Sequence, residues 1–329
     1  MRQVRTLGLL GTGVIGGGWA ARALHAGFDV VACDLDPAME DWLRGAVETA
    51  APALRRLTEG LALPAPGRLS FTTDPAEMAQ ACDAIQENVP EVVDIKRAAL
   101  ARVAEVAGPD VLILSSTSGF MPSDLQAGLR HPDRILVGHP FNPVYLCPLV
   151  EVVPGKATSD EAAGAAATLY EAMGMEVLLV RKEVPGHLSD RLQEAMWREI
   201  LHSLNDDIAT TAELDAAIVY GPGLRWAFMG MNQIYMIAGG EGGARHFMEQ
   251  FGPCLEEPWS HLQAPDLTPE IVDRFVEGTA RQAGGRSVRD LEAIRDECLV
   301  AIQTVLAKHD IGAGRTLNAW ARRLDAETR

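Results

Sequence analysis

The sequence is poor in basic residues and has no long apolar run. Lysine and arginine total 29 against 45 aspartates and glutamates, which gives a net charge of −16 over 329 residues. Nucleic-acid binding needs a basic face that neutralises phosphates, so this balance argues against it. No apolar run approaches the roughly 20 residues that a membrane-spanning helix requires. We therefore expect neither a nucleic acid nor a membrane as a partner.

Cysteines are few and scattered along the chain. The five cysteines form no CxxC pair and no Cys/His cluster. This spacing argues against a disulfide framework and against a zinc site, and it favours reduced thiols in a cytoplasm. The N-terminal apolar stretch passes directly into a glycine motif, which favours a strand over a signal peptide. We expect a cytoplasmic protein without a bound metal.

Two regions of different pattern divide the chain. Residues 1–184 alternate short β-branched runs with helical patterns, as in Val4–Leu10 and Ile15–Ala26. This alternation predicts an α/β Rossmann-type fold, a doubly wound sheet with helices on both faces. After Pro185-Gly186 the β-branched runs stop, and apolar residues recur at helical spacing. We predict a dinucleotide-binding α/β domain over 1–184 and an all-α domain over 185–329.

A glycine motif opens the first region. Gly11-Thr12-Gly13-Val14-Ile15-Gly16 matches G-x-G-x-x-G, follows an apolar run and begins a helical pattern. The first glycine allows a tight turn, the second lets the backbone approach a pyrophosphate, and the third lets helix and strand pack closely. The helix N-terminus then presents unpaired N–H groups to the phosphates. The motif predicts a dinucleotide site formed by Gly11, Gly13, Val14, Ile15 and Gly16.

Asp34 indicates which dinucleotide is bound. It ends the second expected strand, 18 residues after Gly16, near the spacing typical of a ribose-binding acid. A carboxylate accepts hydrogen bonds from a ribose 2′-hydroxyl and repels a 2′-phosphate, and no arginine follows closely. We therefore expect NAD rather than NADP. The alternative is that Asp34 is only a turn residue at the end of a strand.

Three polar residues stand where strands of such a sheet would end. Ser118 and His139 each follow a short apolar run, and Glu151 is flanked by four apolar residues. A carboxylate is expensive to bury unless it is paired, and His139 is the nearest plausible partner. A His–Glu pair suits alcohol oxidation, because imidazole takes the hydroxyl proton while the carboxylate orients the ring. Structural roles, such as a turn histidine or a helix-capping serine cluster, are the alternatives.

The order of these motifs resembles that of the 3-hydroxyacyl-CoA dehydrogenase family over nearly the whole chain. The strings GHPFNPVYLCPLVEVV at 138–153 and VRKEVPGHLSDR at 180–191 carry the likeness. The resemblance implies that Ser118 contacts the substrate oxygen, that His139 is the acid/base and that Glu151 orients it. It also implies that Glu91 and Lys96 help to hold the cofactor and that two chains form a homodimer.

The resemblance also bears on the substrate. The CoA enzymes of the family carry an asparagine where this chain has Asp190, and the string GLRWA at 223–227 looks like branches that act on small hydroxy acids. The resemblance implies that the substrate is L-carnitine. Aromatic faces would then bind its trimethylammonium group, and an arginine would bind its carboxylate. The candidate substrate-binding residues are Phe141, Asp190, Arg225, Trp226 and Phe251. Alternatives are dehydrogenation of L-gulonate or of a short 3-hydroxyacyl-CoA, and a non-enzymatic, lambda-crystallin-like structural protein.

Overall fold

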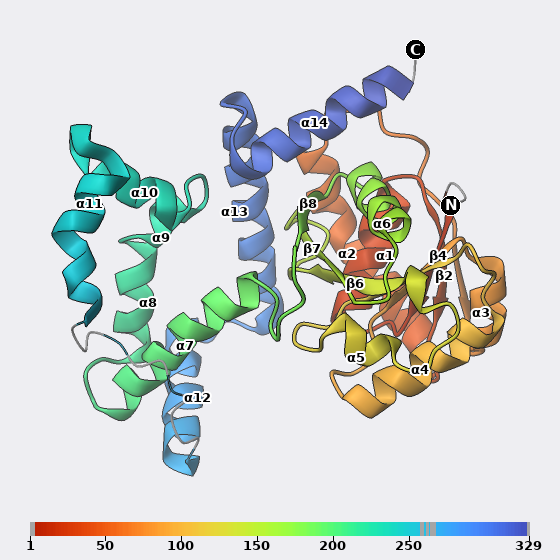
Figure 1. Cartoon of the computed structure of the whole chain (residues 1–329), viewed down its shortest axis with the longest axis horizontal. Coiled ribbons are helices and arrows are strands. Elements are labelled where there is room, and N and C mark those ends of the chain that lie inside the picture. The colour runs from red at the N-terminus through yellow and green to blue at the C-terminus, as the bar shows by residue number, and fades with distance from the viewer. Residues whose placement is uncertain (1–3, 257–259, 261–262, 264–267, 328–329) are drawn as a thin grey trace. The chain divides into compact units, whose positions relative to one another are not determined.

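The computed structural model describes residues 4–256, 260, 263 and 268–327. These residues form two compact units: one holds the chain up to residue 190 together with residues 299 onward, and the other holds residues 191–298. The first unit contains the sheet and the second is helical (Figure 1). No helix in the described part of the chain is long and apolar enough to cross a bilayer.

The first unit is built on an eight-stranded sheet with the order β3-β2-β1-β4-β5-β6-β7-β8. All neighbouring strands are parallel except β6 and β7, which are antiparallel. The strand order reverses between β1 and β4, and ligands of open α/β sheets bind beyond the carboxyl ends at such a point. The strands are β1 (Thr6–Leu10), β2 (Asp29–Cys33), β3 (Leu69–Thr72), β4 (Ala84–Glu87), β5 (Leu112–Ser115), β6 (Ile135–Pro140), β7 (Leu149–Pro154) and β8 (Glu176–Leu179).

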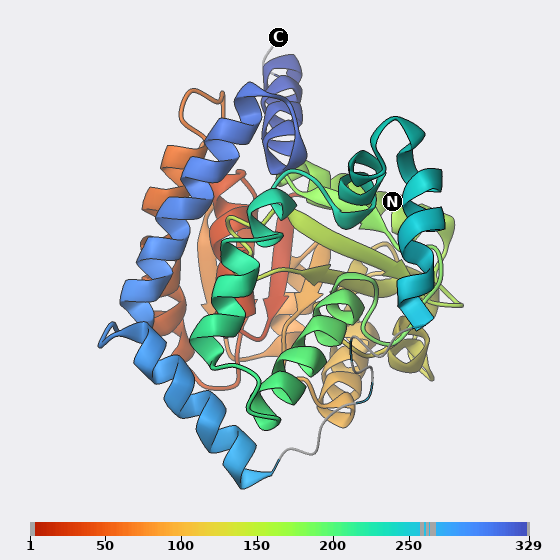
Figure 2. The same cartoon turned by 90° about the vertical axis from the view of Figure 1, so that its left-hand side faces the viewer.

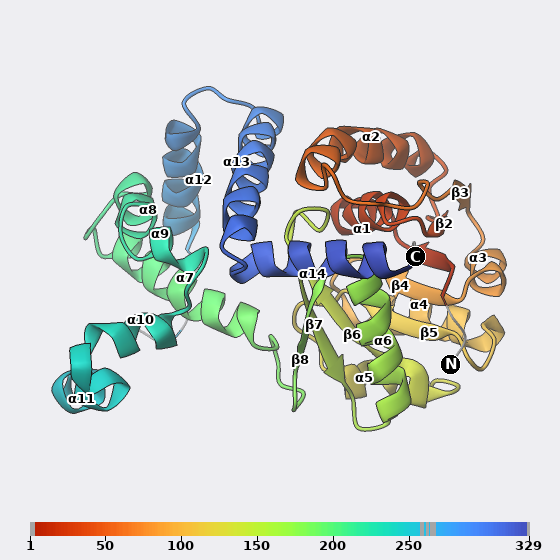
Figure 3. The same cartoon turned by 90° about the horizontal axis from the view of Figure 1, so that it is seen from above.

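Buried apolar clusters cover both faces of the sheet. Because side chains alternate along a strand, Leu112 and Leu114 belong to one cluster and Ile113 to the other. The first face is packed by α1 (Val14–His25), α2 (Met39–Leu57) and α6 (Asp160–Ala172). The second face is packed by α3 (Pro75–Ala81), α4 (Val93–Val106) and α5 (Pro122–Gln126). Seen from above, α1 and α2 lie side by side (Figure 3).

The last helix, α14 (Gly312–Glu327), packs on the first unit beside α6 (Figure 3). Trp320 is 3% exposed and donates its indole N–H to the carbonyl of Ala172 at 3.2 Å. The guanidinium of Arg323 pairs with the carboxylate of Glu171 at 2.8 Å. The end of the chain therefore completes the core of the unit in which the chain begins.

All the regular secondary structure in the described part of the second unit is helical. Helix α8 packs on α12, where the side chain of Thr211 fills the space beside Gly278. Helices α10 and α11 follow each other and pack together (Figures 1 and 2). At their contact the rings of Tyr235 and Phe247 stack with centroids 4.5 Å apart. The helices are α7 (Ser189–Asn205), which starts in the first unit, α8 (Thr211–Val219), α9 (Gly223–Trp226), α10 (Met231–Ala238), α11 (Gly243–Phe251), α12 (Pro269–Ala283) and α13 (Val288–Lys308), which ends in the first unit.

The expected α/β Rossmann-type sheet followed by helices is confirmed, with differences in detail. The antiparallel pairing of β7 was not anticipated; only residues 141–148 join it to β6, and this connection is too short for a crossover helix. The compact units also differ from the division into 1–184 and 185–329, because the described residues from 299 onward pack with the first unit. As an assignment of functional domains, that division stays a prediction.

Candidate active site

The turn between β1 and α1 has the backbone geometry of a dinucleotide-binding turn. Gly11 has φ of +91°, which favours glycine, and a Cβ at Gly16 would collide with the carbonyl of Gly11. A Cβ at Gly13 would meet nothing within 4 Å, so the space in front of it is open. No side chain caps α1, and its first turn holds no acidic residue. The N–H groups of Val14 and Ile15 therefore belong to a helix start that fits a pyrophosphate.

Asp34 lies beside this turn, just after β2. One of its carboxylate oxygens accepts hydrogen bonds from the backbone N–H and the hydroxyl of Thr12, both at 3.0 Å. The other oxygen lies 3.3 Å from the N–H of Asp36. A carboxylate has about four acceptor positions, so Asp34 retains capacity for ribose hydroxyls. The residues present thus fit NAD, although the contact itself stays a prediction.

Glu91 and Lys96 lie together but hold protein groups in this structure. Lys96 is 1% exposed, and its ammonium lies 2.9 Å from Glu87 Oε1 and 3.2 Å from Glu91 Oε2. Burial raises the pKa of Glu87 despite the opposing effects of Lys96 and of a serine hydroxyl. Glu91 Oε1 accepts hydrogen bonds from the Thr117 hydroxyl and from the N–H groups of Ser118 and Gly119. Cofactor contacts of Glu91 and Lys96 stay a prediction.

His139 and Glu151 face each other across the two antiparallel strands. They are paired in the register of β6 and β7, and His139 Nδ1 lies 2.9 Å from Glu151 Oε2. Both are buried, at 4% and 0% exposure. Burial tends to raise the pKa of Glu151, but hydrogen bonds from His139 and from the start of α7 outweigh it and hold the pKa below its ordinary value. An ionised Glu151 can only accept hydrogen bonds, so Nδ1 is the donor of this contact, and in the neutral tautomer that fits it the lone pair of His139 is on Nε2.

The start of α7 holds the second oxygen of this carboxylate. Glu151 Oε1 accepts hydrogen bonds from the N–H groups of Leu188 and Ser189, both at 3.0 Å, and from the Ser189 hydroxyl at 3.2 Å. Helix N-termini favour negative charge, so this contact compensates the desolvation of Glu151. The expected pairing of His139 with Glu151 is present, and the additional support from α7 was not anticipated.

Two expected substrate-binding residues lie against the His139 ring. The Phe141 ring meets it edge-on with centroids 4.9 Å apart. Asp190 Oδ2 lies 3.6 Å from His139 Nε2, which is too long for a hydrogen bond but close enough to stabilise a positive charge on the ring. His187 was not anticipated as a site residue; it is fully buried, with its ring centroid 5.5 Å from that of His139.

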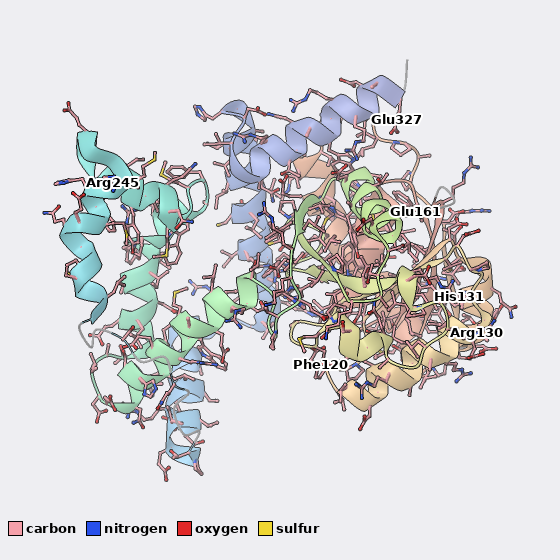
Figure 4. All side chains as sticks on the ribbon, viewed as in Figure 1. Phe120, Arg130, His131, Glu161, Arg245 and Glu327 are labelled. Atoms are coloured by element: carbon pink, nitrogen blue, oxygen red, sulfur yellow. The ribbon has the colours of Figure 1, made fainter. Side chains whose placement is uncertain are left out.

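Ser118 is exposed in the loop that follows β5. Phe120, two residues further along this loop, is labelled in Figure 4. His187 Nε2 lies 3.1 Å from the carbonyl of Thr117, and the N–H of Gly186 lies 3.3 Å from the carbonyl of Gly119. The turn that precedes α7 therefore fixes the loop of Ser118, while the first residues of α7 fix Glu151. Both expected catalytic segments, after β5 and on β6, lie at the carboxyl ends of neighbouring strands.

The remaining expected substrate-binding residues belong to the second unit. Arg225 is exposed on α9, and Trp226 is half-buried, with its indole N–H lacking a hydrogen-bond partner among the described residues. Phe251, at the end of α11, lies 5.0 Å from the ring of Phe247. The contact of these three residues with substrate stays a prediction.

The site combines a proton acceptor on β6 with a dinucleotide turn after β1 of the same sheet. Among the described residues, no group of histidine, cysteine, aspartate and glutamate side chains is placed to hold a metal ion. The five cysteines are free thiols. A buried imidazole with an ionised carboxylate behind it is suited to accept a proton from a hydroxyl group.

Comparisons with known proteins agree with this chemistry. The NAD-binding domain model of the 3-hydroxyacyl-CoA dehydrogenases matches residues 6–184, and the C-terminal domain model matches residues 186–285. An L-carnitine dehydrogenase of Pseudomonas aeruginosa is 55% identical over 91% of this chain and 93% of its own length. An L-carnitine dehydrogenase of Bacillus cereus is 48% identical over 94% of this chain and 95% of its own length.

Solved structures show the same fold. A 5-formyl-3-hydroxy-2-methylpyridine 4-carboxylic acid 5-dehydrogenase, described as an NAD⁺-dependent dismutase, has a TM-score of 0.80 and 26% identity and covers 92% of this chain and 99% of its own. The 3-hydroxybutyryl-CoA dehydrogenase of Escherichia coli has a TM-score of 0.59 and 27% identity over 76% of this chain and 53% of its own. The chain therefore belongs to the 3-hydroxyacyl-CoA dehydrogenase family.

Proposed function

We propose that the protein oxidises L-carnitine to 3-dehydrocarnitine with NAD. The observation that carries this proposal is the buried His139–Glu151 pair, which lies in the same sheet as the dinucleotide turn after β1. It occurs in a chain about half identical, over nearly its full length, to enzymes named L-carnitine dehydrogenase. Carnitine has a secondary hydroxyl at C3, and its oxidation removes a proton from oxygen and a hydride from carbon.

His139 is the proton acceptor of this reaction. Its Nε2 lone pair takes the proton of the substrate hydroxyl, while Glu151 stabilises the imidazolium through Nδ1. Bound NAD supplies the acceptor of the hydride. Ser118 orients the substrate oxygen from the loop that Glu91 holds. Asp190, 3.6 Å from Nε2, adds negative charge near the imidazolium and near a cationic substrate.

The cofactor residues are assigned to one edge of the sheet. Gly11, Gly13, Val14, Ile15 and Gly16 receive the pyrophosphate at the start of α1. Asp34, which follows β2, accepts the ribose hydroxyls, and this carboxylate favours NAD over NADP. Lys96 and Glu91, which follow β4 and pair with each other, also help to hold the cofactor.

Substrate specificity comes from both units. Phe141 contributes an aromatic edge next to His139. In the second unit, Arg225 binds the carnitine carboxylate, and Trp226 and Phe251 offer aromatic faces to the trimethylammonium group. We therefore assign cofactor binding to residues 1–184 and the remaining substrate contacts to residues 185–329.

The protein works as a cytoplasmic homodimer. The second unit exposes large apolar side chains, among them Leu224 (72%) and Ile237 (60%), and such surfaces mark contacts with another chain. Light scattering after gel filtration should give about twice the chain mass of 35.4 kDa. A mass of one chain at micromolar concentration contradicts the dimer and leaves the reaction untouched.

Initial rates test the reaction directly. NADH formation is followed with NAD and either L-carnitine, D-carnitine, L-gulonate or 3-hydroxybutyryl-CoA. We expect turnover of L-carnitine above the other three compounds. Turnover of another compound alone would overturn the substrate and retain the reaction class. Absence of turnover with all four would favour a non-enzymatic, crystallin-like role.

A further inference from the structure

Gln86 lies buried on β4, between the cofactor turn and the acid/base strand. It is 1% exposed, yet its side-chain amide is satisfied on both ends. The amide nitrogen donates to the Ser116 hydroxyl at 2.8 Å and to the carbonyl of Gly138 at 3.1 Å. The amide oxygen accepts the hydroxyl of Tyr170 at 2.7 Å. Because β5 separates β4 from β6, this side chain reaches across one strand to the residue before His139.

The Ser116 hydroxyl extends these contacts to the glycine turn. It accepts hydrogen bonds from Gln86 and from the indole N–H of Trp19, the latter at 3.1 Å. It donates to Asn88 Oδ1 at 2.7 Å, and the amide nitrogen of Asn88 lies 3.4 Å from the carbonyl of Gly11. The donor and acceptor roles are thus fixed along the whole chain of contacts, from the cofactor turn to Gln86.

Tyr170 closes the other end of the network. It is fully buried on α6, and burial raises the pKa of its phenol, so the neutral hydroxyl is the donor. A Cβ at Gly138 would collide with that hydroxyl, so the glycine next to His139 leaves room for it. The Tyr170 and Trp19 rings lie 5.3 Å apart and pack the network against α1.

An apolar core would be easier to build at this position. Burying the Gln86 amide, the Tyr170 hydroxyl and the Trp19 indole N–H beside the partly buried Ser116 costs free energy unless every group is paired, and a single broken contact is expensive. Such a fully paired group does, however, allow only one arrangement of the elements it joins. The joined elements are the cofactor turn, the loop of Ser118 and the strand of His139.

We propose that Gln86, with Ser116 and Tyr170, is a positioning residue that sets the distance between the cofactor turn and the His139 strand. The kinetic part of this inference rests on the proposed function. The cofactor-binding part does not, because NADH affinity is measured without turnover. None of the three side chains touches the His139 imidazole in the described contacts, so the network acts on geometry and leaves proton transfer itself to His139 and Glu151.

The variants Gln86→Leu, Tyr170→Phe, Ser116→Ala and Ser116→Thr test the network. The dissociation constant of NADH is measured by fluorescence. The value of kcat and its pH profile are measured with L-carnitine as substrate, and Tm is measured by calorimetry. We expect Ser116→Ala to weaken NADH binding about fivefold to tenfold and Ser116→Thr, which keeps the hydroxyl, to restore it. We expect Gln86→Leu and Tyr170→Phe to lower kcat about tenfold without moving the midpoint of the pH profile.

Thr168→Ala is the matched control. Its hydroxyl is on the same helix as Tyr170 but donates only locally, to the carbonyl of Gly164. A loss of Tm in the network variants with unchanged NADH affinity and kcat would overturn the proposal, and so would equal effects in Thr168→Ala. If Gln86→Leu fails to fold, Tyr170→Phe and the Ser116 pair decide. If the wild type does not turn over L-carnitine, the proposed function fails and NADH affinity alone decides the network.

Discussion

Glu151 accepts the Nδ1–H of His139 on one carboxylate oxygen while the N-terminus of α7 occupies the other. The imidazole is thereby fixed in one tautomer and one orientation, with Nε2 free of this carboxylate. Because the first residues of α7 stabilise the ionised form of Glu151, the negative charge behind His139 persists at neutral pH.

Glu151→Gln should therefore lower kcat for L-carnitine about a hundredfold or more, because an amide nitrogen facing Nδ1 favours the wrong tautomer. KM for NAD should change little, since Glu151 is remote from the glycine turn in sequence and strand order. The control is Glu183→Gln, whose carboxylate accepts hydrogen bonds from the N–H and hydroxyl of Ser123. A Glu151→Gln enzyme with wild-type kcat would exclude the His–Glu mechanism.

Asp190→Asn tests the electrostatic part of specificity. We expect KM for L-carnitine to rise about tenfold, because a carboxylate near His139 attracts a cationic substrate and an amide does not. The comparison substrate is 3-hydroxy-5,5-dimethylhexanoate, in which an uncharged carbon replaces the nitrogen. Its KM should be the same in both enzymes. An equal rise for both substrates would show that Asp190 acts on the site without sensing the charge.

Asp34→Asn tests the choice of cofactor. Removal of the negative charge should raise KM for NAD about tenfold and raise the ratio of kcat/KM for NADP to that for NAD. Asp36→Asn, two residues further along the same turn, is the matched control because its carboxylate bonds only the N–H of Ala38 among the described contacts. Equal changes in both variants would contradict a specific role of Asp34.

His25 gives the fold a pH dependence separate from the active site. Burial, with the charges of Arg22 and Arg55, lowers the pKa of His25 to about 4. Between about pH 4 and the ordinary value of 6.5, the unfolded chain therefore binds a proton that the folded chain does not. The free energy of unfolding should fall as pH drops through this range and level off below it.

Urea denaturation at several pH values measures this effect. The variant His25→Gln, which keeps a polar group near the Thr58 hydroxyl, should lose less stability than the wild type between pH 6.5 and pH 4. Parallel stability curves for the two proteins over this range would show that His25 titrates normally in the folded state.

The sheet and the His–Glu pair were accessible from the sequence for a physical reason. Parallel strands buried on both faces read as short apolar runs, and the polar residues that follow them gather at one edge. Glu151 stood out because four apolar neighbours made an unpaired carboxylate there untenable. The sequence places His139 and Glu151 in successive expected strands, and the two side chains meet once those strands, β6 and β7, pair with each other.

Other features depend on contacts between distant segments and leave no local signal. Gln86 reads as one polar residue near the end of a short strand, and only the fold shows that it meets Ser116 and Tyr170. His187 stands in a Pro-Gly turn that reads as a linker, and its burial against the Thr117 loop follows from tertiary packing. Leu69–Thr72 is a half-buried edge strand with no continuous apolar run.

The return of α14 to the first unit has a consequence for synthesis. The nascent chain leaves the ribosome with its N-terminal part first, so all eight strands emerge before α14, the helix that carries Trp320. Until that helix arrives, the surface of α6 around Ala172 lacks its indole partner. The cofactor-binding unit is therefore finished last although it is begun first, and a ribosome that stalls within the helical unit leaves behind a nascent chain with an open core.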